Sequence, residues 1–156
     1  MKYIAHRGLF NGPDKTLENH PEQILNALDL GFDVEIDLWH VNCRPQEWWL
    51  GHDAPTYPID ASFLNHKQIW AHCKNIPALH ELIELDYCCD FFWHQEDDCV
   101  LTANNYIWTY PGKPLTAKSV MVMPEYVDLT LKNTIGANCY AICSDYVNQL
   151  RPTTKI

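Results

Sequence analysis

Short apolar runs alternate with polar or amphipathic connectors along the whole chain, and the apolar runs are rich in β-branched and aromatic residues. Runs of this length and composition are typical of β-strands. The pattern predicts strands over residues 3–6, 32–38, 47–50, 69–74, 90–94, 106–110, 119–123 and 140–143. We therefore expect a sheet to form the core of the protein.

Helical spacing of apolar residues appears between some of these strands. Ile24, Leu25 and Leu28 place a helix over residues 18–30, which ends at Gly31. Residues 76–85 repeat the pattern with Pro77 near the start, and residues 61–66 and 129–136 carry it less clearly. The other connectors late in the chain are too short for full helices.

A succession of strand, helix and strand with right-handed crossovers predicts a parallel sheet, either open and doubly wound or closed into a barrel. A complete eightfold barrel needs about 250 residues, sometimes about 200, and this chain has 156. The expected fold class is α/β: a compact, shortened TIM-type (β/α) barrel with some helices reduced or missing. No repeat or linker marks a boundary, so residues 1–156 are expected to form a single domain.

The formal net charge of −9 argues against nucleic acid or an anionic membrane surface as a partner, since both need clustered Lys and Arg. The seven cysteines cannot all pair, and they show no zinc-type spacing. The chain starts without a signal peptide or apolar span, so we expect a cytoplasmic protein with no membrane insertion. The oligomeric state stays open.

The first candidate site follows an apolar strand, where the chain reads His6-Arg7-Gly8. Ligands bind at the carboxyl ends of strands in α/β proteins. Arg7 offers a planar fork for two phosphate oxygens, and His6 can exchange a proton near neutral pH. A capping histidine beside a surface arginine is an equally good interpretation of this tripeptide alone.

The second candidate site is the segment with Glu35 and Asp37, which period-two alternation puts on one face of a strand. Two buried carboxylates repel each other unless a cation lies between them, so they indicate a divalent metal ion. A half-exposed edge strand with solvated acids is the alternative. A third strand ends in His52 and Asp53, and the aspartate could orient the histidine.

The order and spacing of these pieces resemble the glycerophosphodiester phosphodiesterases, within the phosphatidylinositol-phospholipase-C-like barrels. That family has HRG after the first strand, ENT opening the first helix, E-x-D on the second strand and HD after the next. The corresponding segments here are His6-Arg7-Gly8, Glu18-Asn19-His20, Glu35-Ile36-Asp37 and His52-Asp53. Only the threonine of ENT is replaced.

The resemblance implies a phosphoric diester hydrolase that acts on a small-molecule phosphodiester. It implies that Glu35 and Asp37 bind one divalent metal ion, with Mg²⁺ or Ca²⁺ expected. His6 and His52 would act as general acid and base, and Arg7 would hold the phosphate. The family is thought to use a hydroxyl of the substrate as the first nucleophile and to pass through a cyclic phosphate.

The resemblance covers the first half of the chain, to about Lys74, and departs from the family on the next strand. The family has E-x-K there, with the Glu as a metal ligand, whereas this chain has His72-Cys73-Lys74. We expect His72 to be the third ligand, which makes Mn²⁺ or Zn²⁺ possible, and Lys74 to contact phosphate. A short Pro-rich stretch over residues 54–58 stands where the family has an insertion, so glycerol specificity does not carry over.

Later strand ends supply candidates for pocket lining by position: His94, Gln95, Trp108, Tyr110, Glu125 and Asp145. The expected substrate-binding residues are Arg7, Lys74, His94 and Trp108. A purely structural role is the alternative for His94 and Glu125. No chemistry is assigned to His20, His40, His66 or His80, and the many aromatic residues are expected to fill the core.

Two other functions remain open. The chain could be a non-catalytic module that binds a phosphate ligand, or a phospholyase that stops at a cyclic phosphate. Two proton-transfer groups, His6 and His52, favour an enzyme because a binding module does not need them.

Overall fold

The computed structural model describes residues 1–42, 47–132, 134 and 136–152. Its strands are β1 Lys2–Ala5, β2 Asp33–His40, β3 Trp48–Leu50, β4 Tyr57–Ile59, β5 Ile69–Cys73, β6 Asp90–Phe92, β7 Cys99–Leu101, β8 Ile107–Thr109, β9 Ser119–Val122 and β10 Ala141–Ser144. The α-helices are α1 Pro21–Asp29, α2 Ile76–Glu84 and α3 Val147–Leu150. Short 3₁₀ turns occur at His6–Gly8 (η1), Ala61–Asn65 (η2) and Pro124–Tyr126 (η3).

All ten described strands belong to one mixed sheet, whose longest path runs β4-β3-β2-β1-β10-β9-β8-β7. The central strand β2 pairs with β1 in parallel near its start and with β3 in antiparallel near its end. Along its other edge β2 pairs with β5 in parallel, and β5 pairs with β6. The eight-residue β2 therefore joins the antiparallel hairpin of β3 and β4 to the parallel part of the sheet.

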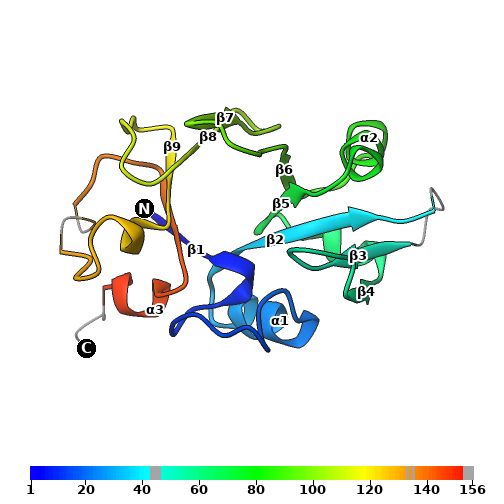
Figure 1. The fold of residues 1–156 in the computed structure, drawn as a ribbon, viewed down its shortest axis with the longest axis horizontal. Coiled ribbons are helices and arrows are strands. Elements are labelled where there is room, and N and C mark those ends of the chain that lie inside the picture. The colour runs from blue at the N-terminus through cyan, green and yellow to red at the C-terminus, as the bar shows by residue number, and fades with distance from the viewer. Residues whose placement is uncertain (43–46, 133, 135, 153–156) are drawn as a thin grey trace.

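The sheet follows a curved path (Figure 1), so its two faces enclose different apolar clusters. On the inner face, Ile4, Trp70, Phe92, Trp108 and Val120 belong to one buried cluster. The outer face packs against the helices in a larger cluster, which includes Val34, Ile36 and Leu38 of β2, Ile69, Ala71 and Cys73 of β5, and Ala78 and Leu82 of α2. Alternation along each strand thus separates an inner core from an outer core.

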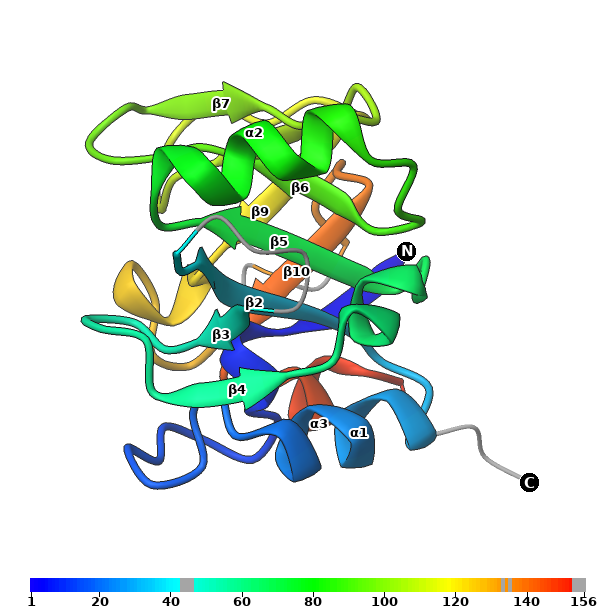
Figure 2. The same ribbon diagram turned by 90° about the vertical axis from the view of Figure 1, so that its right-hand side faces the viewer.

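The helices cover the outer face, with α2 over β5 and β6, and α1 and α3 toward the opposite end of the molecule (Figure 2). In α1, Pro21 occupies the first turn, and Ile24 and Ala27 are buried. In α2, the Asn75 side chain caps the first turn by accepting a hydrogen bond from the Ala78 N–H at 3.1 Å. In the described part of the chain, no helix is both long enough and apolar enough to span a membrane.

The expected shortened TIM-type barrel is wrong. The described chain forms a ten-stranded mixed sheet with three short α-helices, and β3, β4 and β7 run antiparallel to their neighbours. Only α1 and α2 connect parallel strands, because the later connectors hold turns, 3₁₀ segments or the hairpin of β7 and β8. Among the described strands, β6 pairs only with β5, and β7 pairs only with β8. One backbone hydrogen bond, from the Ala103 N–H to the Phe91 carbonyl, joins β6 to the segment that follows β7.

The eight predicted strands are present, and their ends differ from the predicted ones by at most two residues. β4 and β7 were not expected, since β4 carries Pro58 and both have only three residues. The expected helices at 18–30 and 76–85 correspond to α1 and α2, and the segment at 61–66 is a 3₁₀ turn. The expected helix at 129–136 is wrong for the described residues, which form turns there; positions 133 and 135 lie outside them.

Gly51 directly follows β3, and its close contacts test how tightly the chain turns between β3 and β4. Its φ of 149° lies in the region that favours glycine, and an added Cβ would clash with the Ala54 carbonyl oxygen. We expect Gly51→Ala to lower the free energy of unfolding by about 3 kcal/mol, from backbone strain and overpacking together. Gly136→Ala is the control, because φ is also positive there but none of the described residues other than its chain neighbours has an atom within 4 Å of the added Cβ. Urea denaturation that gives equal losses for both variants would contradict the expected clash.

Candidate functional site

A cavity of about 250 Å³ lies at the carboxyl ends of the strands on the inner face of the sheet. It is lined by side chains from most of the strand ends: His6, Arg7, Glu35, Asp37, His52, His72, His94, Trp108, Tyr110, Pro111, Val122, Met123 and Tyr126. The site therefore occupies the position where ligands bind in sheets of parallel strands.

Period-two alternation explains how these side chains reach the cavity. Trp70 belongs to the inner apolar cluster, and His72, two residues later on β5, lines the cavity. The same step leads from Phe92 on β6 to His94. Successive inward positions of one strand thus pass from the apolar core to the polar site. Glu35 and Asp37 of β2 both line the cavity, as their spacing predicts.

Asp37 is the most heavily paired group in the cavity. It is 1% exposed, and its Oδ2 accepts a hydrogen bond from Asn19 Nδ2 at 2.9 Å. The same oxygen lies 3.0 Å from Arg7 Nε, while Oδ1 lies 3.2 Å from His72 Nδ1 and 3.4 Å from Lys74 Nζ. Burial would raise the pKa of Asp37, but these partners outweigh it and hold the pKa well below its usual range. Asp37 is therefore ionised at any physiological pH.

The buried charge of Glu35 has fewer hydrogen-bond and ion-pair partners among the described residues than that of Asp37. It is 2% exposed, its Oε2 accepts a hydrogen bond from the Arg7 backbone N–H at 3.0 Å, and the same oxygen lies 3.9 Å from His6 Nε2. Burial raises the pKa of Glu35, and the negative charge of Asp37 raises it further. A positive charge placed between Glu35 and Asp37 would relieve this repulsion.

His72 completes a group of three side chains that could hold a cation. One ligand atom each from Glu35, Asp37 and His72 lies within 4.8 Å of the others. His72 Nε2 is 3.0 Å from the His94 carbonyl oxygen, which can only accept, so Nε2 carries the proton. Its Nδ1 faces Asp37 Oδ1, so an ion held between these two residues would contact this nitrogen. Histidines that bind metals commonly donate their other N–H to a backbone carbonyl in this way.

His6 is held by a residue from the far end of the sequence. Its Nδ1 lies 2.8 Å from Asp145 Oδ1, and the Asp145 backbone N–H donates to Glu125 Oε1 at 3.0 Å. Ser144 Oγ donates to the same Glu125 oxygen at 2.9 Å. Burial would lower the pKa of His6, but the hydrogen bond with Asp145 and the charge of Glu35 raise it above the ordinary value of 6.5. Asp145 therefore orients the ring and stabilises its charged form.

Arg7 lies in the left-handed backbone region, with φ of 51°. Its Nη1 donates to Glu18 Oε2 at 3.1 Å, and its Nε approaches Asp37 at ion-pair distance without hydrogen-bond geometry. The carboxylates of Asp37, Glu35 and Glu18 raise the pKa of Arg7 against the effect of burial. Arg7 is thus a fixed, permanent cation in the cavity wall.

His52 stands at the edge of the cavity, where its side chain is 38% exposed. It follows β3, and its Nδ1 lies 2.6 Å from Oδ1 of Asp53, whose side chain is 87% exposed. The orienting partner expected for His52 is therefore present, but this pair is more exposed than that of His6 and Asp145.

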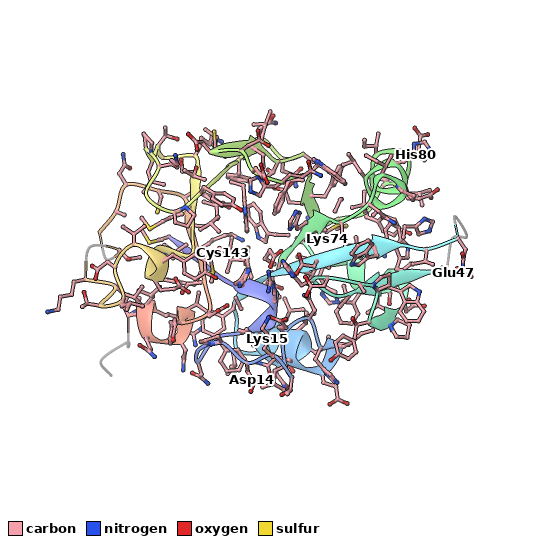
Figure 3. All side chains as sticks on the ribbon, viewed as in Figure 1. Asp14, Lys15, Glu47, Lys74, His80 and Cys143 are labelled. Atoms are coloured by element: carbon pink, nitrogen blue, oxygen red, sulfur yellow. The ribbon has the colours of Figure 1, made fainter. Side chains whose placement is uncertain are left out.

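The substrate-binding residues expected from sequence divide into two groups. Arg7, His94 and Trp108 line the cavity. Lys74 pairs with Asp37 instead and is not among the lining residues; its label stands near the centre of the molecule in Figure 3. Of the other expected lining residues, Gln95, Glu125 and Asp145 do not line the cavity. Gln95 is exposed, and the buried Glu125 accepts a hydrogen bond from the Asp145 backbone N–H.

The sequence marks Asn19 only as the middle residue of Glu18-Asn19-His20, whereas the structure shows what its side chain contacts. Its side chain donates to the Asp37 carboxylate and accepts from the Asp37 backbone N–H, both at 2.9 Å. Asn19 has φ of 58°, a conformation that asparagine tolerates better than most residues.

Met123 and Tyr126 also line the cavity, and no pattern in the sequence identifies them as site residues.

Comparisons with protein-family models, with curated proteins and with solved structures find no match. The geometry of the cavity is therefore the basis on which a function is proposed below.

The pair of His6 and Asp145 makes a measurable prediction. We expect the imidazole pKa of His6 to lie above about 6.5 in the metal-free protein, and Asp145→Asn to lower it. Because the folded pKa is the higher one, the stabilising effect of the pair is complete below about pH 6.5 and disappears as pH rises through the folded value. Asp145→Asn should therefore destabilise the protein more on the acidic side than on the alkaline side.

NMR titration of the histidine ring protons in the presence of a chelator measures this pKa. His80, which is exposed at the periphery on α2 (Figure 3), serves as a reference signal that Asp145→Asn should leave unchanged. An unaltered His6 titration in the variant would show that Asp145 does not control the ring.

Proposed function

We propose that this chain is a metal-dependent phosphodiester hydrolase acting on a small molecule. The observation that carries the proposal is that one cavity is lined by two carboxylates, three histidines and an arginine that the chemistry requires: Glu35, Asp37, His6, His52, His72 and Arg7. The resemblance of the first half of the sequence to glycerophosphodiester phosphodiesterases supports the same reaction. The proposal concerns these side chains and does not depend on the barrel fold of that family.

The charges around Asp37 favour a bound cation. Glu18, Glu35, Asp37 and Asp145 bring four carboxylates, whereas Arg7 and Lys74 bring two permanent positive charges. Burial and the neighbouring charge of Asp37 together raise the pKa of Glu35. A divalent ion held by Glu35, Asp37 and His72 would balance it, and two oxygen donors with one imidazole nitrogen suit Mn²⁺ or Zn²⁺ as well as Mg²⁺. When bound, such an ion neutralises charge that develops on the phosphoryl oxygens.

Arg7 supplies the protein's own positive charge for the phosphate. A guanidinium has five N–H donors, and Glu18 and Asp37 contact two of its nitrogens. Its position in the cavity wall leaves other N–H groups for an anionic ligand. Because Arg7 is held by carboxylates on two sides, it requires no reorganisation when the substrate binds.

His6 and His52 can move the two protons that the reaction needs. One imidazole takes a proton from the attacking hydroxyl, and the other gives a proton to the oxygen that leaves phosphorus. His6 is paired with Asp145 through Nδ1, so its Nε2 is the atom available for the transfer. His52 is paired with Asp53 through Nδ1 in the same manner. The shared arrangement supports a catalytic pair more than a module that only binds phosphate.

Two other functions use the same cavity. A binding module would hold a phosphate ligand without turnover, and a phospholyase would release a cyclic phosphate. Phosphorus NMR of the products distinguishes all three outcomes, because hydrolysis gives a monoester, the lyase gives a cyclic ester, and the module leaves the diester intact.

The histidines provide the test of catalysis. With a panel of phosphodiesters, we expect His6→Ala and His52→Ala each to lower kcat by about two to four orders of magnitude, while binding changes much less. His66→Ala is the control, because His66 is exposed on the segment after η2 and does not line the cavity. Absence of turnover for the whole panel, with phosphodiester binding unchanged in both variants, would favour the binding module.

The three ligand side chains provide the test of the metal site. We expect Mn²⁺ or Ca²⁺ to raise the Tm of the protein, and Glu35→Gln to abolish the shift because it removes one anionic ligand. Glu22→Gln, on the exposed side of α1, should keep it. His72→Glu should move the preference toward Mg²⁺ and Ca²⁺, since a carboxylate is the harder ligand. Equal metal-induced shifts in all variants would exclude this site.

A further inference from the structure

One half of the cavity carries no charged side chain. The part of the wall that comes from the ends of β6, β8 and β9 and the residues after them includes His94, Trp108, Tyr110, Val122 and Met123. His94 follows β6, Trp108 lies on β8, and Val122 ends β9. A phosphate bound near Arg7 would leave this aromatic and apolar half to one of the two ester groups of the substrate.

His94 is the group in this half that requires a polar partner. It is 7% exposed, and neither of its ring nitrogens has a hydrogen-bond partner among the described residues. Its backbone carbonyl oxygen binds His72 Nε2, and its ring packs on Tyr110 with a centroid distance of 4.4 Å. A buried polar group without a partner is costly, so its presence indicates that a ligand supplies the missing hydrogen bond.

Trp108 gives this half a flat, rigid wall. It is 4% exposed and stacks on Phe92, with ring centroids 4.5 Å apart. Val122 and Met123 are also buried, at 7% and 4% exposure, and offer only apolar atoms. A planar aromatic group is the ligand that such a surface favours, because stacking contacts and burial add together.

The polar groups of this half are too few for a polyol. Beside the imidazole of His94, only the hydroxyls of Tyr110 and Tyr126 are available among the lining residues, and these side chains are 39% and 74% exposed. A glycerol or inositol group would bring several hydroxyls against Val122 and Met123, where they would lose their hydrogen bonds to water. The volume sets a size limit as well. A cavity of about 150 Å³ can hold benzene, so about 250 Å³ accommodates a phosphate and one ring.

We propose that this half of the cavity recognises a single aromatic ring that carries a polar atom on its edge, and that the ring's polar atom hydrogen-bonds to His94. The inference rests on the proposed function for the phosphate end of the ligand. The preferred substrate class is then a phosphodiester in which one alcohol is a small hydroxylated aryl group.

The experiment compares binding of 4-hydroxyphenyl phosphate, phenyl phosphate and glycerol phosphate by isothermal titration in one calcium-containing buffer. We expect the hydroxyphenyl compound to bind at least about tenfold more tightly than glycerol phosphate, and about fivefold more tightly than phenyl phosphate, the usual effect of one neutral hydrogen bond. His94→Phe keeps the ring and removes both nitrogens, so it should abolish the difference between the two aryl compounds. His66→Phe is the control and should leave all three affinities unchanged.

Nitrogen-15 NMR of the histidine rings gives a second readout, in which 4-hydroxyphenyl phosphate should shift the His94 nitrogens of the unaltered protein. Equal or tighter binding of glycerol phosphate would overturn the inference, as would a His94→Phe variant that weakens both aryl compounds equally. Turnover of glycerol diesters without preference for aryl diesters would overturn it while leaving the hydrolase proposal intact. Selective aryl binding through His94, with no turnover of any diester, would support the pocket and contradict the hydrolase proposal.

Discussion

The burial of one carboxylate, that of Asp37, organises the charged end of the sheet. A carboxylate that is 1% exposed has lost nearly all of its water, and the protein replaces that water with Arg7, Asn19, His72 and Lys74. These partners come from η1, from the segment before α1 and from the end of β5, so one charge joins segments that are distant in the sequence. Removing one partner of such a buried pair typically costs about 3–5 kcal/mol. The left-handed conformations of Arg7 and Asn19 are retained because both residues contact this carboxylate.

The same charge determines what the neighbouring groups can do. Asp37 is ionised, and its charge adds to the effect of burial in raising the pKa of Glu35, two residues away on the same face of β2. His72 turns Nδ1 toward Asp37 because its other nitrogen is fixed by a backbone carbonyl. The interactions that stabilise the carboxylate therefore also arrange three donors around a position suited to a cation. His6 lies at the margin of this group and receives its own counter-charge from Asp145.

The cavity is asymmetric because the curved sheet brings unlike strands to face each other. The inner face of β2 carries acids, whereas the ends of β6, β8 and β9 contribute His94, Trp108 and Val122. In the function proposed above, Arg7 and a cation held by the acids would bind an anionic end of the ligand, and the other side would contact an aromatic end with a polar edge. Under that proposal, charge would position one part of the ligand, while apolar contacts and the His94 imidazole would select the other.

The sequence by itself determined the local features. Period-two alternation is a property of the strand, so the shared face of Glu35 and Asp37 and the positions of eight strands could be predicted without knowledge of their neighbours. The path of the sheet could not, because strand pairing depends on backbone hydrogen bonds between remote segments, and the short strands β4 and β7 carry little pattern. Asp145, which pairs with His6, lies 139 residues away in the sequence. The role of Asn19 depends on its two hydrogen bonds with Asp37, one to the carboxylate and one from the backbone N–H. Tertiary structure alone decided these contacts, because the charge of a buried group is compensated by whichever side chains the fold brings to it in space.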